Sequence, residues 1–296
     1  MLWALFTIVA AAAQTFRNAT QRGLTARVGT MGATLVRFLF GLPFACLFLA
    51  GVSAATSLTP PIPGAANFAW IAMGGLFQIA ATALMLAAMR ARSFVVTIAY
   101  TKTEPVQAAV FALMFLGERP TPWSVGAILV ATAGVLLMSW PKKAGPDEAR
   151  AAWTPALLGL GAGACFALSA VGFRGGVLRL ETPSFVMAAT TVLVLGLALQ
   201  TAVMTAWFAL FDRPALAKVA QAWRPSLFAG LMGALASQFW FLAFALTSVA
   251  NVRTLGLVEM IFAQILSRRM FKQGASGREA AGMGLILTGL AALLWG

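Results

Sequence analysis

The sequence predicts an all-α polytopic membrane protein with ten transmembrane helices, arranged as two inverted five-helix repeats. The first observation is composition: of 296 residues, 60% are hydrophobic and 10% are charged, whereas about a quarter of a soluble domain is charged. The second is that apolar stretches long enough to cross a bilayer recur along the whole chain. The third is that the two halves of the chain resemble each other. A soluble protein this apolar would precipitate, so the chain is expected to lie in a membrane.

The apolar stretches are separated by short segments rich in proline, glycine and charge, such as TPPIPG at 59–64. Such segments interrupt helices because proline lacks a backbone donor and glycine weakens helical order. None of them is long enough to form a soluble domain. The predicted spans are 2–20, 29–52, 66–89, 94–116, 122–140, 154–174, 184–211, 226–247, 250–271 and 277–295.

An internal duplication divides the chain at its middle. Residues 86–105 align with 240–260, which places Glu104 opposite Glu259, and GAILVATAG at 126–134 aligns with GMGLILTG at 282–289. The domains expected are 1–140, a polar linker at 141–153, and 154–296. Because each half has five spans, the second half enters the membrane in the opposite orientation, a plan that many secondary transporters share.

The basic residues predict an orientation rather than a nucleic-acid partner. The net charge is +13, and the lysines and arginines gather in the links that follow odd-numbered spans. Links after even-numbered spans carry little beyond Arg119 and Arg179. The positive-inside rule places the odd links in the cytoplasm and both termini outside. Short basic links of this kind contact lipid headgroups.

The residue types exclude several functions. The chain has no histidine, which removes the usual imidazole proton relay, the usual zinc ligand and a Ser-His triad. No phosphate-binding loop or dinucleotide fingerprint is present. We therefore expect no metal, no cofactor and no enzymatic activity, because an intramembrane enzyme would need a catalytic group that does not stand out.

Two stretches resemble the EamA-type drug/metabolite transporter (DMT) superfamily. They are RFLFGLPFACLFL at 37–49 and EPVQAAVFALMFLGERPTPWSVGAILVATAGVLL at 104–137. The resemblance implies that 1–140 and 154–296 are a first and a second EamA-like repeat. It also implies a multi-pass protein of the bacterial inner membrane that moves metabolites, amino acids, nucleotide sugars or drugs.

The chain departs from the family pattern in three ways. MFKQGAS at 270–276 stands where the first half has FLGERPT, so the Gly-Glu pair is not repeated. Gln14 stands where the related small multidrug transporters have a glutamate in their first span. Ten-span members keep both termini in the cytoplasm, which is opposite to the orientation that the charges predict.

Ionisable side chains inside the spans are the candidates for function, because burying a charge in a bilayer is costly unless it is paired or faces water. They are Arg37, Lys102, Glu104, Arg253 and Glu259. Lys102 and Glu104 are two residues apart and point to different sides of a helix, so each needs a partner on another helix. Glu104 could meet Arg37 or Arg253. The alternative to a binding role is an ion-paired strut that only locks helices together.

Uncharged neighbours complete the predicted site. Pro105 follows Glu104 directly and is predicted to kink the helix and act as a gate. Tyr100, Gln107 and Trp240 could contact a ligand, although a hydrogen bond between helices also explains such side chains. The predicted substrate-binding residues are Arg37, Tyr100, Lys102, Glu104, Gln107, Trp240, Arg253 and Glu259, with Glu104 and Glu259 as the coupling residues.

These features predict a secondary-active exporter of a small metabolite or amino-acid-like solute. The solute would cross through a central cavity between the repeats by alternating access, and protons would be carried on Glu104 or Glu259 if transport is coupled to them. The excess of cationic candidates favours an anionic solute. The other functions considered are export of lipophilic cations and lipid flipping or scrambling. Expected partners are the solute and membrane lipid, with the chain as a monomer or homodimer and no nucleic acid bound.

Overall fold

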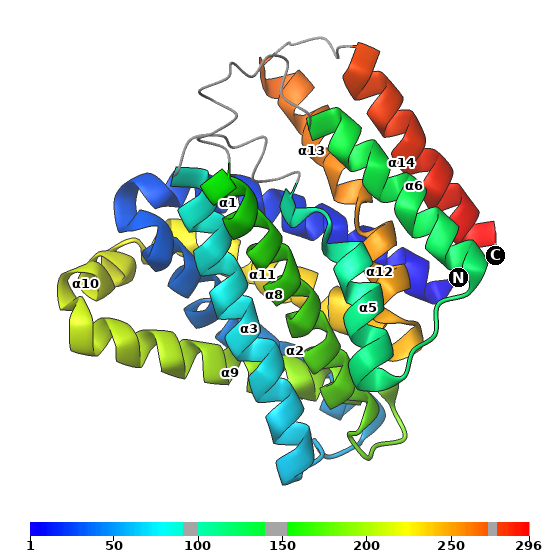
Figure 1. The fold of residues 1–296 in the computed structure, drawn as a ribbon. Coiled ribbons are helices and arrows are strands. Elements are labelled where there is room, and N and C mark those ends of the chain that lie inside the picture. Colours follow the sequence, from blue (N-terminus) through cyan, green and yellow to red (C-terminus); the bar gives the residue numbers. More distant parts are fainter. Residues whose placement is uncertain (91–99, 140–152, 272–276, 296) are drawn as a thin grey trace. The chain divides into compact units, whose positions relative to one another are not determined.

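The computed structural model describes all residues except 91–99, 140–152, 272–276 and 296 (Figure 1). Every regular element in this described part is a helix. The predicted linker 141–153 lies outside the described residues apart from Trp153, where a helix begins. The helices are α1 (Leu2–Leu39), α2 (Leu42–Thr56), α3 (Ala65–Arg90), α5 (Glu104–Leu116), α6 (Pro122–Ser139), α8 (Trp153–Leu178), α9 (Phe185–Phe211), α10 (Arg213–Gln221), α11 (Trp223–Leu246), α12 (Val249–Leu255), α13 (Val258–Phe271) and α14 (Gly277–Trp295).

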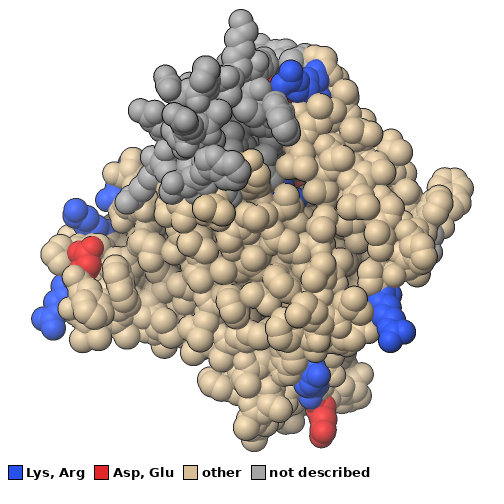
Figure 2. Space-filling view, viewed as in Figure 1, with Lys and Arg blue, Asp and Glu red and all other residues tan. Residues whose placement is uncertain are grey.

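The helices have the length and composition of a multi-pass membrane protein. Six described segments are long and apolar enough to span a membrane, and two shorter apolar helices lie at Glu104–Leu116 and Pro122–Met138. Large apolar side chains such as Met114 and Leu210 are exposed, as lipid contact requires. Most of the face seen in Figure 2 is uncharged. The all-helical membrane fold is thus confirmed, while the count of ten spans and the inverted repeat remain predictions.

Helix α1 is bent sharply at Gly29. This residue has φ 72° and ψ 173°, a conformation open in practice only to glycine. The amide Nε2 of Gln21 donates to the carbonyl of Ala33 at 2.8 Å, whereas twelve residues of straight helix would separate them by about 18 Å. The chain therefore folds back at Gly29. The link predicted at 21–28 is helical, and the change of direction comes at the end of that link.

The chain forms two compact units. Unit 1 is Met1–Ile79 with Gly172–Thr247, and unit 2 is Ala80–Val171 with Ser248–Gly296. Each unit takes segments from both halves of the sequence, and α3 and α8 each contribute to both units. The units therefore differ from the domains 1–140 and 154–296, which were defined from the internal sequence duplication. Those domains remain a prediction.

Unit 1 is built around α11. Helix α1 packs along α11, and α9 contacts α1, α2, α10 and α11. Glycines allow α3 and α8 to touch: a Cβ atom on Gly172 would lie 2.5 Å from the backbone nitrogen of Gly74. Phe173 fills the space beside Gly74 and Gly196 and packs on Phe241, with ring centroids 4.5 Å apart. Small residues thus bring these helices close together, as is common in membranes.

Unit 2 contains a close antiparallel pair, α6 and α14. A Cβ atom on Gly134 would lie 2.7 Å from the carbonyl of Gly282, and one on Gly289 would lie 2.7 Å from the backbone nitrogen of Ala131. These glycines belong to the two segments, 126–134 and 282–289, that align in the sequence. The aligned segments therefore pack on each other.

Candidate functional site

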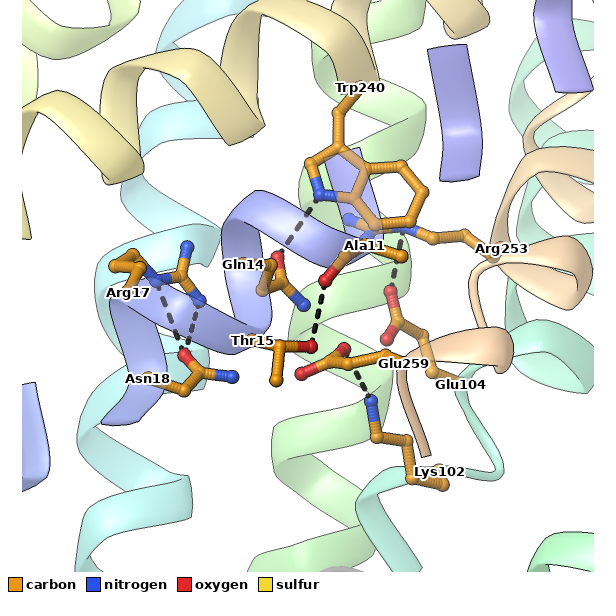
Figure 3. Close-up of polar contacts among 10 residues, drawn as sticks. All are labelled: Ala11, Gln14, Thr15, Arg17, Asn18, Lys102, Glu104, Trp240, Arg253 and Glu259. Carbon is orange, nitrogen blue, oxygen red and sulfur yellow. Dashed lines mark hydrogen bonds and ion pairs between the residues drawn. The ribbon is translucent and has the colours of Figure 1, made fainter. Parts of the chain in front are cut away.

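Four charged side chains form two ion pairs in unit 2, which we name the charged cluster. Lys102 Nζ lies 3.0 Å from Glu259 Oε2, and Arg253 Nε lies 2.9 Å from Glu104 Oε1 (Figure 3). Their side chains are 9% to 19% exposed. Each pair joins one residue from the first half of the sequence to one from the second. The pairing of Glu104 with Arg253, one of two alternatives that the sequence left open, is confirmed.

The charged cluster lies where two helical stretches are interrupted. Lys102 and Thr103 form a turn before α5, and Gly256 and Leu257 form a turn between α12 and α13. Both turns contain the same short backbone bond, from Thr103 N to the Tyr100 carbonyl at 3.2 Å and from Leu257 N to the Thr254 carbonyl at 3.0 Å. The two interruptions lie within one residue of corresponding positions in the sequence alignment, in which Lys102 stands opposite Leu257.

The charges match the helix ends that these interruptions create. Glu104 and Glu259 stand in the first turns of α5 and α13, and Arg253 stands in the last turn of α12. Carboxylates are stabilised at helix N-termini and cations at C-termini, because the backbone dipoles leave partial positive and negative charges there. The interruptions therefore stabilise the same charges that the apolar surroundings disfavour.

Pro105 begins a helix rather than kinking one. It lies in the first turn of α5, where a backbone N–H would have no intrahelical acceptor, so its missing donor costs little. The predicted kink is thus an interruption at Lys102 and Thr103, immediately before Glu104. A role for Pro105 as a gate remains a prediction.

Tyr100 and Gln107, the uncharged predicted site residues of unit 2, lie beside the turn at Lys102 and Thr103. Tyr100 is 37% exposed, and its carbonyl also accepts a hydrogen bond from the Thr103 hydroxyl at 2.6 Å. Gln107 Nε2 donates to Thr103 Oγ1 at 3.0 Å, and lies 3.5 Å from the Leu160 carbonyl on α8. Gln107 thus holds the turn and contacts a neighbouring helix.

Arg37 and Trp240 belong to unit 1. Arg37 Nη2 lies 3.5 Å from Ser237 Oγ, and Trp240 Nε1 donates to Gln14 Oε1 at 3.1 Å (Figure 3). Both side chains are buried. They connect α1 to α11.

Glu118 positions α12, a role that the sequence analysis did not assign. Gly117 ends α5 with φ 69°, a left-handed conformation that favours glycine. The next residue, Glu118, accepts a hydrogen bond from the backbone nitrogen of Val249 through Oε2 at 3.1 Å, and Ser248 Oγ caps Asn251 N at 3.3 Å. Both acceptors satisfy the N-terminus of α12, the helix that carries Arg253. The Gly-Glu pair was the available signal, because it ends one helix and supplies a carboxylate.

Removing this cap should loosen α12. Glu118→Ala is expected to destabilise the protein by about 1 kcal/mol, because it removes an acceptor and a negative charge from a helix N-terminus. Glu118→Gln keeps a carbonyl acceptor and should lose less. Thermal unfolding of the purified protein in detergent measures both effects. Glu181→Gln is the control, because Glu181 is exposed and lies in unit 1; an equal loss in that control would contradict the capping role.

A groove of about 240 Å³ lies between α6 and α14, away from the charged cluster. Its lining is apolar and includes Trp123, whose indole nitrogen donates to the Ala292 carbonyl at 2.7 Å. None of the predicted site residues lines it. In the described part of the chain, no three acidic or cysteine side chains gather as a metal site would require.

Known proteins resemble the chain in sequence over residues 1–140 and in fold over nearly all of its length. Residues 1–140 match the EamA-like transporter family. No protein with a curated description matches the chain. Among 28 matching chains of solved structures, one titled "Crystal structure of protein" has a TM-score of 0.69 at 17% identity, covering 98% of this chain and 94% of that one. At this identity the likeness shows a shared fold only.

Proposed function

From the match of residues 1–140 to the EamA-like transporter family, we propose that the protein is a member of the drug/metabolite transporter superfamily and a secondary-active transporter of a small solute. A transporter of this type would not be an enzyme. We further propose the bacterial inner membrane as its location and export as its direction.

The observation that carries this proposal is the charged cluster at two interrupted helices. Interrupted helices at membrane depth occur where the backbone is buried in protein or lines a water-filled cavity, because lipid cannot satisfy exposed backbone groups. Interruptions at corresponding positions in two halves are the arrangement expected of a transport site. The two ion pairs keep four charges compensated within apolar surroundings.

Release of one ion pair at a time provides a mechanism for alternating access. In the structure Glu104 contacts Arg253, and Glu259 contacts Lys102. A proton or an anionic solute that neutralises one member would release the other, and the helices on either side of an interruption could then move. We therefore propose Glu104 and Glu259 as coupling residues. Lys102 and Arg253 would form ion pairs with them when no proton or solute is bound.

A transport assay with Glu104→Gln tests the proposal. Cells that express the protein should resist toxic amino-acid analogues or organic acids, and Glu104→Gln at equal membrane abundance should abolish this resistance, because the neutral amide cannot replace the ion pair with Arg253. The control is the exposed Glu181→Gln, which should transport normally.

Three other outcomes would change the assignment. Equal resistance with the unaltered protein and with Glu104→Gln would mean that the ion pair only holds helices together. Resistance to quaternary ammonium compounds alone would favour export of lipophilic cations. Scrambling of labelled lipid in proteoliposomes, with no solute transported, would favour lipid handling.

A further inference from the structure

Helix α10 connects two long apolar helices at one end of unit 1. It follows α9 directly and ends two residues before α11 begins. Its inward side includes Val219, which is fully buried and whose Cγ2 atom would lie 3.2 Å from a Cβ atom on Gly32 of α1. Helix α10 therefore packs on the bundle through one face, and its other face contacts what surrounds the protein.

Four exposed cations lie at this end of unit 1, and none of them forms an ion pair with a residue that the structure describes. Two are on α10 and one is at the start of α11. The fourth lies on α1 next to Val28, which is buried beside the contact between α1 and α10. Lysine and arginine atoms stand out from the surface around α10 (Figure 2). We name Arg27, Arg213, Lys218 and Arg224 the basic end of unit 1.

The contacts of these cations leave the charge positive. Asp212, the acid that precedes α10, accepts a hydrogen bond from Ala215 N through Oδ1 at 3.1 Å and so caps the helix. Arg213 Nε donates to the Ala209 carbonyl at 2.8 Å. Arg224 Cζ lies 5.3 Å from the centre of a neighbouring tryptophan ring. A guanidinium has five N–H donors, so both arginines keep donors for a further acceptor.

Exposed aromatic rings flank α10 on both sides. Trp207 and Phe211 precede it on α9, and Trp223 and Phe228 follow it on α11. Tryptophan is enriched where the hydrocarbon of a bilayer meets the headgroups. The two tryptophans therefore place α10 at the level of the headgroups, which is the level at which lipid phosphates lie. This observation is independent of the charges.

The opposite end of α9 has no excess of charge. The helix has 27 residues, a length of about 40 Å, so its two ends lie at opposite faces of a membrane. The segment before Phe185 carries Arg179 and Glu181, whose charges cancel. Arg179 Cζ lies 4.7 Å from the centre of the Trp70 ring. An arginine beside a tryptophan is thus found at both faces, whereas the excess of cations is found at one.

We propose that the basic end of unit 1 binds the headgroups of anionic phospholipids in one leaflet of the membrane. Headgroups form a continuous layer of phosphates, so the four cations need not converge on one pocket. Each cation near an anionic membrane surface strengthens its attraction about fivefold, and a guanidinium matches a phosphate with paired donors. Because α10 joins α9 to α11 and packs on α1, bound lipid would hold this end of unit 1 together. The inference does not depend on the proposed transport function.

Thermal unfolding in detergent micelles that contain added lipid tests the proposal. Dioleoylphosphatidylglycerol should raise the unfolding midpoint of the unaltered protein in a saturable way, and zwitterionic dioleoylphosphatidylcholine should raise it less. The triple variant Arg213→Gln, Lys218→Gln and Arg224→Gln should need at least about tenfold more phosphatidylglycerol for half of the maximal rise. Lys218→Gln alone, which removes no hydrogen bond of the described structure, should need about fivefold more. Added salt should weaken the effect, because it screens exposed charges.

The matched control exchanges the cations without removing any charge. The variant with Arg213→Lys, Lys218→Arg and Arg224→Lys should respond to phosphatidylglycerol almost as the unaltered protein does. So should Arg179→Gln, which removes an exposed arginine at the opposite end of α9. Glycerol phosphate, which has a phosphate but no acyl chain, should not stabilise the protein at the same concentrations.

Three results would overturn the proposal. The first is an equal response of the triple glutamine variant and the unaltered protein to phosphatidylglycerol. The second is equal stabilisation by phosphatidylcholine, because the lipid would then act through its acyl chains alone. The third is equal stabilisation by glycerol phosphate, because the basic end would then bind a soluble anion. Unfolding midpoints measured without lipid show whether each variant is folded, and Lys218→Gln provides the test if the triple variant is not.

Discussion

Lys102→Glu is expected to destabilise the protein by about 3 kcal/mol or more and to abolish transport. The substitution places a second carboxylate beside Glu259, in a pair whose members are 19% and 9% exposed. Removing one partner of a buried pair leaves the other charge without compensation, and here a repulsion is added. Thermal unfolding and solute uptake in proteoliposomes measure the two losses.

The double variant with Lys102→Glu and Glu259→Lys tests whether the pair is more than a strut. It restores opposite charges at the same two positions, so most of the stability should return. Recovery should be incomplete by about 0.3–1 kcal/mol, because a lysine in the first turn of α13 is unfavourable at a helix N-terminus. Transport should stay lost, since the coupling carboxylate has left α13. Recovery of transport together with stability would show that only the attraction matters.

Gly282→Leu is expected to separate α6 from α14 and to destabilise the protein by about 3 kcal/mol. Its Cβ atom would lie 2.7 Å from the Gly134 carbonyl and 2.9 Å from the Met138 backbone nitrogen. Backbone atoms cannot turn aside as a flexible side chain can, so the whole helix must move. Thermal unfolding in detergent measures the effect.

Gly284→Leu is the matched control for this substitution. Gly284 lies two residues further along α14 and has nothing within 4 Å of the position of its Cβ atom. The new leucine would face lipid, where it costs nothing, and it would remove a flexible glycine from a helix. Stability should therefore stay the same or rise. Equal destabilisation in both variants would show that α14 requires glycine for some reason other than contact with α6.

The sequence predicted what kind of contact the buried charges make, but only partly which residues make it. Lys102 and Glu104 are too close in sequence to pair with each other on a helix, so partners on other helices were expected. Arg253 was one of two partners considered for Glu104, and the structure contains this pair. The Lys102 contact with Glu259 was not foreseen, because side-chain spacing along one helix carries no information on which other helix lies opposite.

The helix interruptions, like the ion pairs, were predicted only in part from the sequence. Pro105 signalled a break near Glu104, although the break precedes the proline and does not bend the helix at it. No proline marks the turn at Gly256 and Leu257, which lies inside the predicted span 250–271. Local propensity there permits a continuous helix. A contact distant in sequence, the carboxylate of Glu118 with the backbone nitrogen of Val249, helps to determine where α12 begins.

The sequence by itself determined that the chain is an all-helical membrane protein with costly charges that require partners. These properties follow from composition, from the lengths of apolar stretches and from the energy of a charge in lipid, all of which are local or additive along the chain. The tertiary structure alone decided which charges meet, because pairing depends on how distant helices pack. It decided, too, that Gln21 lies within hydrogen-bond distance of the Ala33 carbonyl, since one glycine conformation at Gly29 reverses the direction of α1.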